Sequence, residues 1–241
     1  PGKVLKPLLG MTMILQQIDR LKRCRKLDKI IVATSDDPSD DRLVSILESK
    51  KIDVYRGSLD NVLDRFYNAA TPYMPVHVVR LTADCPLADP LVIDKVIDSH
   101  LQQGNDYTAN CVKPTYPDGL DVEVMSYRAL KEAKENAKLP SELEHVTPYI
   151  RNHPQRYKIG NVRNNCDLSA MRWTVDEPED FDFVETVYKR LYSILPNFVM
   201  KDILDLLEKE PELKDLNSSF KRNSGMNNSL NKDKKYLEKK A

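Results

Sequence analysis

The sequence predicts an α/β fold with a mostly parallel sheet and helices on both faces. Two short runs rich in β-branched residues, 29–33 and 77–81, each end in a polar loop, as buried parallel strands commonly do. Segments with helical periodicity alternate with such runs, and the connections between them are short. The length of 241 residues suits one large domain with a small appendage.

The first predicted element is a helix after Gly10, because Met13, Leu15, Ile18 and Leu21 recur at roughly helical spacing. The rest of the first half follows the same reasoning. The expected elements are a strand over 29–33, a helix over 39–51, a strand over 52–55, a helix over 60–70 capped by Asp60, a strand over 77–81, a helix over 90–103 and a strand over 106–112.

The pattern changes after Lys113, where we predict a small inserted α+β layer over about 113–156. Residues 1–210 then form one domain, and residues 211–241 a polar, frayed tail with few large apolar residues. The later elements close the predicted domain. They are a strand over 120–125, helices over 127–137 and 145–153, strands over 157–162 and 171–175, and a helix over 178–194 that begins with a proline.

Composition excludes several classes of protein. Basic and acidic residues both number 37, so no net field draws the chain to nucleic acid or to an anionic membrane, and we expect neither as a partner. The four cysteines are scattered singly, which predicts no zinc knuckle and no disulfide framework. No apolar run approaches the ~18 residues that span a bilayer, and no signal-like segment opens the chain, so we predict a cytoplasmic location.

Polar residues after the predicted strands mark a candidate metal site. Ligands of parallel sheets bind at the carboxyl ends of the strands, and Asp84 and Asp176 each follow a predicted strand. Mg²⁺ takes one or two carboxylates together with substrate phosphate oxygens, so we select this pair as its ligands. The alternative is that each aspartate caps the proline-led helix that follows it.

Three further residues are candidates for contacts with a nucleotide. Lys3, beside Gly2, offers a compact positive charge to a triphosphate, and with Asp84 it is a catalytic candidate. Arg80 lies inside a predicted strand and needs an anionic partner, either Asp84 or a ligand. Thr82 lies in the loop that follows the same strand.

Candidates for substrate binding lie in the second half. Tyr116, Asp121 and Glu123 surround a turn whose acidic and aromatic groups suit sugar hydroxyls or an amine; the alternative is a tight turn with solvated acids. His145 is a further candidate, against a capping or packing role. The chain has no G-x-S-x-G elbow, no complete P-loop and no G-x-G-x-x-G, which disfavours serine hydrolases, P-loop NTPases and ordinary dinucleotide binders.

Several strings together resemble the cytidylyltransferases of the spore coat polysaccharide biosynthesis protein F type, which are related to CMP-KDO and CMP-neuraminate synthetases. The resemblance covers roughly residues 1–194. The strings are Pro1-Gly2-Lys3-Val4-Leu5 and those over 79–87, 116–123, 144–149 and 172–180.

The resemblance implies a Rossmann-like fold of the nucleotide-diphospho-sugar transferase kind, CTP as donor, Mg²⁺ as cofactor, and attack of a sugar hydroxyl on the α-phosphorus with loss of pyrophosphate. Carried over by motif, Asp84 holds the metal, Asp176 completes its site and Lys3 faces the triphosphate. Relatives of this type pair through the segment that matches the predicted insertion, so a homodimer is expected. They also begin with a strand and an arginine- and serine-bearing loop before Pro-Gly-Lys, and we expect such a piece to precede Pro1.

Two alternatives from other classes stay open at this point. A glycosyltransferase that uses a ready-made nucleotide sugar has a similar sheet, but the D-x-D string here, Asp180 to Asp182, falls inside a predicted helix. A non-catalytic binding subunit would bind a sugar or a nucleotide without turnover. The products separate them, because a cytidylyltransferase releases pyrophosphate.

Overall fold

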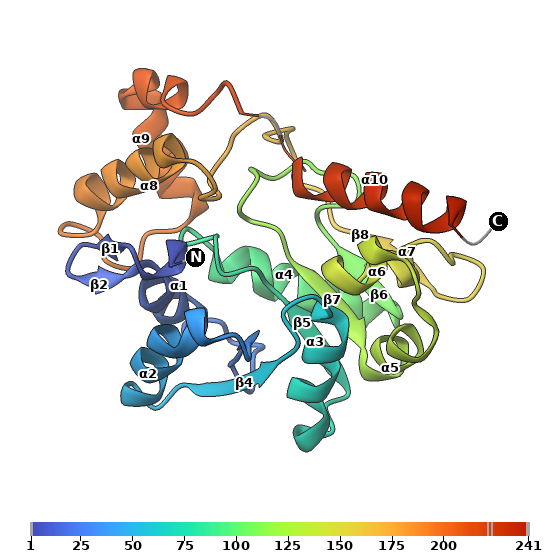
Figure 1. Ribbon diagram of the computed structural model, residues 1–241. Helices are drawn as coiled ribbons and strands as arrows, with labels where there is room; N and C mark the ends of the chain where they lie inside the picture. The colour runs from blue at the N-terminus through green and yellow to red at the C-terminus, as the bar shows by residue number, and fades with distance from the viewer. Residues whose placement is uncertain (1, 221, 223, 240–241) are drawn as a thin grey trace.

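The computed structural model describes residues 2–220, 222 and 224–239 (Figure 1). The first half alternates strands and helices as predicted, and α4 has the predicted bounds. Its elements are η1 (Lys3–Leu5), β1 (Pro7–Leu8), β2 (Met11–Thr12), α1 (Met13–Leu21), β3 (Ile31–Ser35), η2 (Pro38–Asp40), α2 (Asp41–Ser49), β4 (Asp53–Gly57), α3 (Val62–Ala70), η3 (Thr71–Tyr73), β5 (His77–Arg80), α4 (Pro90–Gln103) and β6 (Tyr107–Ala109).

The second half of the chain contributes β7 to the middle of a four-stranded sheet and β8 to its edge, and it contains further helices. The remaining elements are β7 (Glu123–Ser126), α5 (Tyr127–Asn136), α6 (Pro140–His145), α7 (Pro148–Arg151), β8 (Ile159–Asn161), α8 (Pro178–Leu191), α9 (Met200–Lys209), η4 (Pro211–Asp215) and α10 (Ser224–Glu238). In Figure 1 the helices α8 and α9 lie at one end of the molecule and α10 crosses the other end beside α6.

Strands and helices together confirm the α/β fold class, but the strand pairing is mixed and not mostly parallel as predicted. β3 and β4 pair in parallel, and β6 and β8 pair in parallel within a four-stranded sheet of order β5-β7-β6-β8. β7 runs antiparallel to both of its neighbours, because the turn around Gly119 reverses the chain between β6 and β7. β7 comes from the predicted insertion, so that segment contributes directly to the sheet.

Hydrophobic side chains gather in three clusters that hold these layers together. The first cluster joins α4, α8 and α9 around Trp173, the second joins α3, α5 and α7 to the four-stranded sheet, and the third joins α1 and α2 to β4. Trp173 and Val175 belong to the first cluster, so this cluster anchors the segment that leads to Asp176.

Three element predictions are wrong. Residues 171–175 form only an isolated bridge between Asp118 and Arg172, because their N–H groups bond to two different loops rather than to one strand. The predicted helix over 145–153 is split, since Val146 has a φ of 71° and Pro148 starts a new helix. Asn61, and not Asp60, caps α3.

The part of the chain that we predicted as a frayed tail contains η4 and α10. α10 packs beside α6, and the Asp233 carboxylate accepts hydrogen bonds from the Ser141 amide at 2.9 Å and its hydroxyl at 2.5 Å. The packing of α10 against α6 needs few apolar residues, because the hydrogen bonds from Ser141 in the first turn of α6 to Asp233 supply part of the interaction. Across the described residues, no helix combines the length and the apolar character that crossing a bilayer requires.

The surroundings of His100 on α4 indicate that the stability of the protein depends on pH. The ring of His100 is fully buried, with Nδ1 3.1 Å from Thr108 Oγ1 and Nε2 2.9 Å from His77 Nδ1. Burial, followed by repulsion from His77, lowers the pKa of His100 to about 4 from an ordinary 6.5. The native state therefore holds His100 neutral, while the unfolded chain takes up a proton at this residue below pH 6.5. The contribution of His100 to the free energy of unfolding is thus complete above pH 6.5 and is lost as the pH falls towards 4.

We expect His100 to lower the free energy of unfolding by up to about 3 kcal/mol as the pH falls from 7 to 4. Urea unfolding of the wild type and of His100→Gln at several pH values measures it, and the variant should show the shallower pH dependence. His153→Gln, which removes a half-buried histidine from another helix end, is the control and should keep the wild-type slope. Equal slopes in His100→Gln and wild type would contradict the assignment.

Candidate active site

Lys3, Asp84 and Asp176 meet at one point although they are far apart in the sequence. Lys3 Nζ lies 2.9 Å from Asp176 Oδ1 and 3.5 Å from Asp84 Oδ2, and all three side chains are partly exposed. Gly2, with a φ of 80°, turns the chain into η1 and so directs Lys3. The sequence prediction had placed these residues in one site, and the structure brings them together.

Backbone hydrogen bonds explain why the two aspartates are neighbours. The Val175 amide donates to the Asp84 carbonyl at 2.8 Å, and the Trp173 amide donates to the Asp118 carbonyl at 2.6 Å. Residues 172–176 thus run between the loop after β5 and the turn at 116–119. Gly119 permits the close approach, because a Cβ there would lie 2.5 Å from the Thr174 nitrogen.

Neither aspartate caps a helix. α4 is capped by Asp89, whose side chain accepts from two amides of the first turn, and Asp180 serves the start of α8 by accepting from the amides of Asp176 and Glu177 at 3.0 Å. The carboxylates of Asp84 and Asp176 are therefore available to face Lys3.

The two carboxylates affect the pKa of Lys3. Burial alone would lower the pKa of Lys3, but the nearby Asp84 and Asp176 outweigh it, and the pKa is raised above its ordinary value. Lys3 therefore remains a cation at neutral pH. It can offer a fixed positive charge to an anionic group, as a compact ammonium does in phosphate sites.

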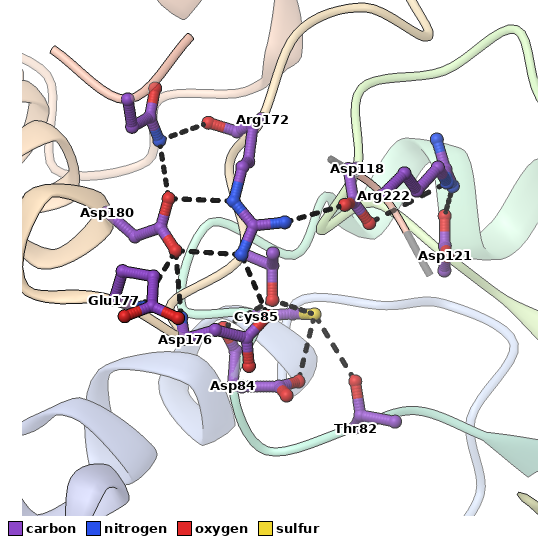
Figure 2. Close-up of polar contacts among 12 residues, drawn as sticks. Thr82, Asp84, Cys85, Asp118, Asp121, Arg172, Asp176, Glu177, Asp180 and Arg222 are labelled. Carbon is purple, nitrogen blue, oxygen red and sulfur yellow. Dashed lines mark hydrogen bonds and ion pairs between the residues drawn. The ribbon is translucent and has the colours of Figure 1, made fainter. Parts of the chain in front are cut away.

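Arg172 is the residue that sequence reasoning missed. Its guanidinium bonds to Asp180 through Nε and Nη2, both at 2.8 Å, to Asp176 Oδ2 at 2.9 Å and to Asp118 Oδ2 at 3.2 Å (Figure 2). Burial lowers the pKa of Arg172, but the hydrogen bonds and charge of Asp180 lead the opposing effects, and the pKa is raised. Arg172 holds Asp176 and Asp118 in place.

One sequence signal for this network exists at Asp180. Glu177 followed by Asp180 three residues later is a capping pattern, which places Asp180 in the first turn of a helix. Asp118 carried no comparable signal, since only tertiary folding brings its turn to Arg172.

The connected cluster carries an excess of negative charge among the described residues. Five carboxylates meet three cationic side chains, which leaves two negative charges when all are ionised. The carboxylates are those of Asp84, Asp118, Asp121, Asp176 and Asp180, and the cations are Lys3, Arg172 and Arg222. An excess of two charges suits a divalent cation.

The donor set fits a hard divalent cation such as Mg²⁺ or Mn²⁺. In residues 2–220, 222 and 224–239, no group of three or more His, Cys, Asp and Glu side chains forms a ready metal cage. Asp84 and Asp176 offer hard carboxylate oxygens that converge on one cation, at present the ammonium of Lys3. Mg²⁺ is commonly held by one or two carboxylates and completed by substrate phosphates and water, so two are enough.

Arg80 pairs with Glu123 and not with Asp84, which was one of the two alternatives that the sequence left open. β5 and β7 run antiparallel with Arg80 opposite Glu123, so the two side chains form a buried ion pair. Glu123 Oε1 also accepts from Tyr107 Oη at 2.5 Å and Thr147 Oγ1 at 2.6 Å. Although burial opposes it, Arg80 keeps the pKa of Glu123 below its ordinary value.

The other predicted site residues fall in different surroundings. Thr82 Oγ1 lies 3.3 Å from Cys85 Sγ, beside Asp84 (Figure 2). Tyr116 is buried and accepts from Lys95 Nζ at 3.0 Å, while Asp121 is paired with Arg222. His145 Nε2 lies 2.9 Å from Ser229 Oγ of α10, which directs that ring towards the helix. Their roles in binding stay predictions.

Comparison with known proteins decides the family. A family model described as cytidylyltransferase matches residues 1–225, nearly the whole chain. The chain belongs to the cytidylyltransferase family. This confirms the resemblance found in the sequence, and it makes the protein a nucleotidyltransferase.

Similar proteins cover almost the same length. The chain is 36% identical over 227 residues to an uncharacterized protein of Methanocaldococcus jannaschii, covering 92% of this chain and 90% of the relative. It is 32% identical over 219 residues to the spore coat polysaccharide biosynthesis protein SpsF of Bacillus subtilis, covering 88% and 90%. A cytidylyltransferase structure from Leptospira borgpetersenii superposes with a TM-score of 0.83 at 28% identity, covering 89% and 90%.

Proposed function

We propose that this cytidylyltransferase transfers CMP from CTP to the hydroxyl of a sugar, releases pyrophosphate and requires Mg²⁺. The observation that carries the proposal is the convergence of Asp84 and Asp176 on the cationic Lys3. Phosphoryl transfer needs little covalent chemistry from the protein, because positioning and charge neutralisation supply most of the catalysis. The relative SpsF, named for spore coat polysaccharide biosynthesis, favours a sugar of a surface polysaccharide or a nonulosonic sugar as the acceptor.

Each residue of the site has a specific task in this proposal. Asp84 and Asp176 would hold the magnesium ion, which when bound neutralises charge on the triphosphate. Lys3, with its raised pKa, would stay protonated and bind phosphate oxygens. Arg172 touches neither phosphate nor sugar in this scheme; it keeps Asp176 in place through their 2.9 Å ion pair.

The D-x-D string does not favour the glycosyltransferase alternative. Asp180 is fully buried, and its two carboxylate oxygens accept from Arg172, from Asn217 Nδ2 and from two backbone amides. These bonds leave Asp180 engaged within the protein, so it is a poor candidate for a metal ligand.

Product analysis tests the proposal. The protein is incubated with Mg²⁺ and a panel of neutral, amino and acidic sugars, in one reaction with CTP and in a parallel reaction with nucleotide sugars, and ³¹P NMR follows the products. Pyrophosphate and a CMP-sugar are the expected products; release of a nucleoside diphosphate from a nucleotide sugar, with no turnover of CTP, would support the glycosyltransferase instead.

Self-association through residues 113–156 is part of the same proposal. Sedimentation velocity measures it, with a species of twice the monomer mass expected and a single monomer peak contradicting it.

A further inference from the structure

A segment near the C-terminus lies over the acidic side of the site. We call residues 217–220 together with Arg222 the C-terminal strap. Asn217 Nδ2 donates to the Arg172 carbonyl at 2.9 Å and to Asp180 Oδ1 at 2.8 Å, and the Arg172 guanidinium lies 6.0 Å from the centre of the Phe220 ring. The strap is thus fastened to the residue that positions Asp176.

Arg222 reaches from the strap to the turn that sequence analysis assigned to the substrate. It forms an ion pair with Asp121, and its Nη1 donates to the Tyr116 carbonyl at 3.2 Å. Its Nε lies 3.7 Å from Asp118 Oδ1, too far for a hydrogen bond, and this buried Nε has no other partner among the described residues. Figure 2 shows Arg222 pointing at Asp118 and Asp121.

These contacts connect Arg222 to the proposed metal site through alternating charges. Lys3 pairs with Asp176, Asp176 with Arg172, Arg172 with Asp118, and Asp118 faces Arg222. Each cation in this series lies between two carboxylates. A change at Arg222 therefore alters the charge that Asp118 and Asp121 present to the site.

Asp121 is the more exposed of the two carboxylates that Arg222 faces. Its side chain is 31% exposed, whereas those of Asp118 and Arg222 are each 14% exposed. Burial raises the pKa of Asp121 to about 6, and the charge of Arg222 is the leading effect that opposes this rise. Without Arg222, a larger fraction of Asp121 would be protonated at neutral pH.

We propose that Arg222 is a positioning residue for the acceptor: its ion pairs hold the side chains of Asp118 and Asp121 in place, so that Asp121 accepts hydrogen bonds from the sugar. The inference rests on the proposed function. A carboxylate at this place favours an acceptor that presents hydroxyl or ammonium hydrogens, and it disfavours one that presents a carboxylate. The part of the acceptor that contacts Asp121 therefore carries hydroxyl or amino groups and no carboxylate.

Steady-state kinetics of Arg222→Ala and Arg222→Lys test the proposal. In Arg222→Ala we expect the KM for the best acceptor of the panel to rise on the order of 10–10²-fold, with the KM for CTP unchanged. Arg222→Lys keeps the charge and should restore part of the loss. Arg190→Ala, which removes an exposed ion pair with Glu210, is the control and should behave as wild type.

A second measurement is independent of turnover. The carboxyl carbon of Asp121 is followed by NMR against pH in wild type and in Arg222→Ala, and its pKa should be higher in the variant. If the wild type is active, either of two results in Arg222→Ala would overturn the proposal. One is an unchanged KM for the acceptor, and the other is an equal rise in the KM for CTP and in the KM for the acceptor. Identical titrations of Asp121 would overturn it whether or not the wild type turns over CTP, while absence of turnover in wild type itself refutes only the proposed function.

Discussion

Asp84→Asn should reduce CTP-dependent pyrophosphate release by roughly 10²–10³-fold while the protein stays folded. Asparagine keeps the size of the side chain and removes the negative charge that faces Lys3 at 3.5 Å. The proposed magnesium ion then loses one of its two carboxylates, and Lys3 loses one of the two groups that hold it. The measurement is the initial rate with saturating CTP, at several Mg²⁺ concentrations.

The Mg²⁺ dependence separates a metal ligand from a structural residue. If Asp84 holds the ion, the variant should need a higher Mg²⁺ concentration for half-maximal rate. Asp205→Asn, which removes an exposed aspartate paired with Lys201, is the matched control and should keep the wild-type rate. A rate within twofold of wild type in Asp84→Asn would contradict the assignment.

Arg172→Met should lower the free energy of unfolding by about 3–5 kcal/mol, the usual effect of breaking a buried ion pair. Asp180 is fully buried and receives two hydrogen bonds from Arg172, so methionine would leave its charge without its main partner. Burial tends to raise the pKa of Asp180, but Arg172 leads the effects that lower it. Urea or guanidinium unfolding at neutral pH measures the loss.

A double variant tests whether the loss comes from the pair. Arg172→Met combined with Asp180→Asn should be destabilised by clearly less than the two single losses together, because the second change removes the stranded charge. Arg190→Ala again serves as a control for loss of an arginine at an exposed pair. A loss below about 1 kcal/mol in Arg172→Met would show that the network adds little to stability.

The sequence predicted best those elements whose bounds depend on neighbouring capping and turn residues. α4 has the predicted bounds because Pro90 fixes its first turn, Asp89 caps it and Gly104 ends it in a left-handed conformation. Asp84 and Asp176 were selected because each follows a predicted strand, and Lys3 because it stands beside Gly2. Residues 171–175 form no strand, so the two aspartates are neighbours through the hydrogen bond from the Val175 amide to the Asp84 carbonyl and not through adjoining strand ends.

Long-range pairing could not be predicted in the same way. Arg80 has Asp84 four residues away in the sequence, yet it pairs with Glu123 because β7 lies beside β5. Arg222 lies in a stretch whose composition indicated a solvated tail, and its contacts with Asp118 and Asp121 depend on the path of the chain after α9. Neither pairing leaves a periodic trace in the sequence.

Calorimetric titration of CTP into the protein, in Mg²⁺ and then in EDTA, tests the central claim most directly. The claim is that Asp84, Asp176 and Lys3 form a site for magnesium and a cytidine triphosphate. We predict binding of CTP in Mg²⁺ that is much weaker in EDTA, weaker for UTP, and lost in Asp84→Asn. CTP binding with the same affinity in EDTA and in Asp84→Asn, or no binding of CTP at all, would contradict the account.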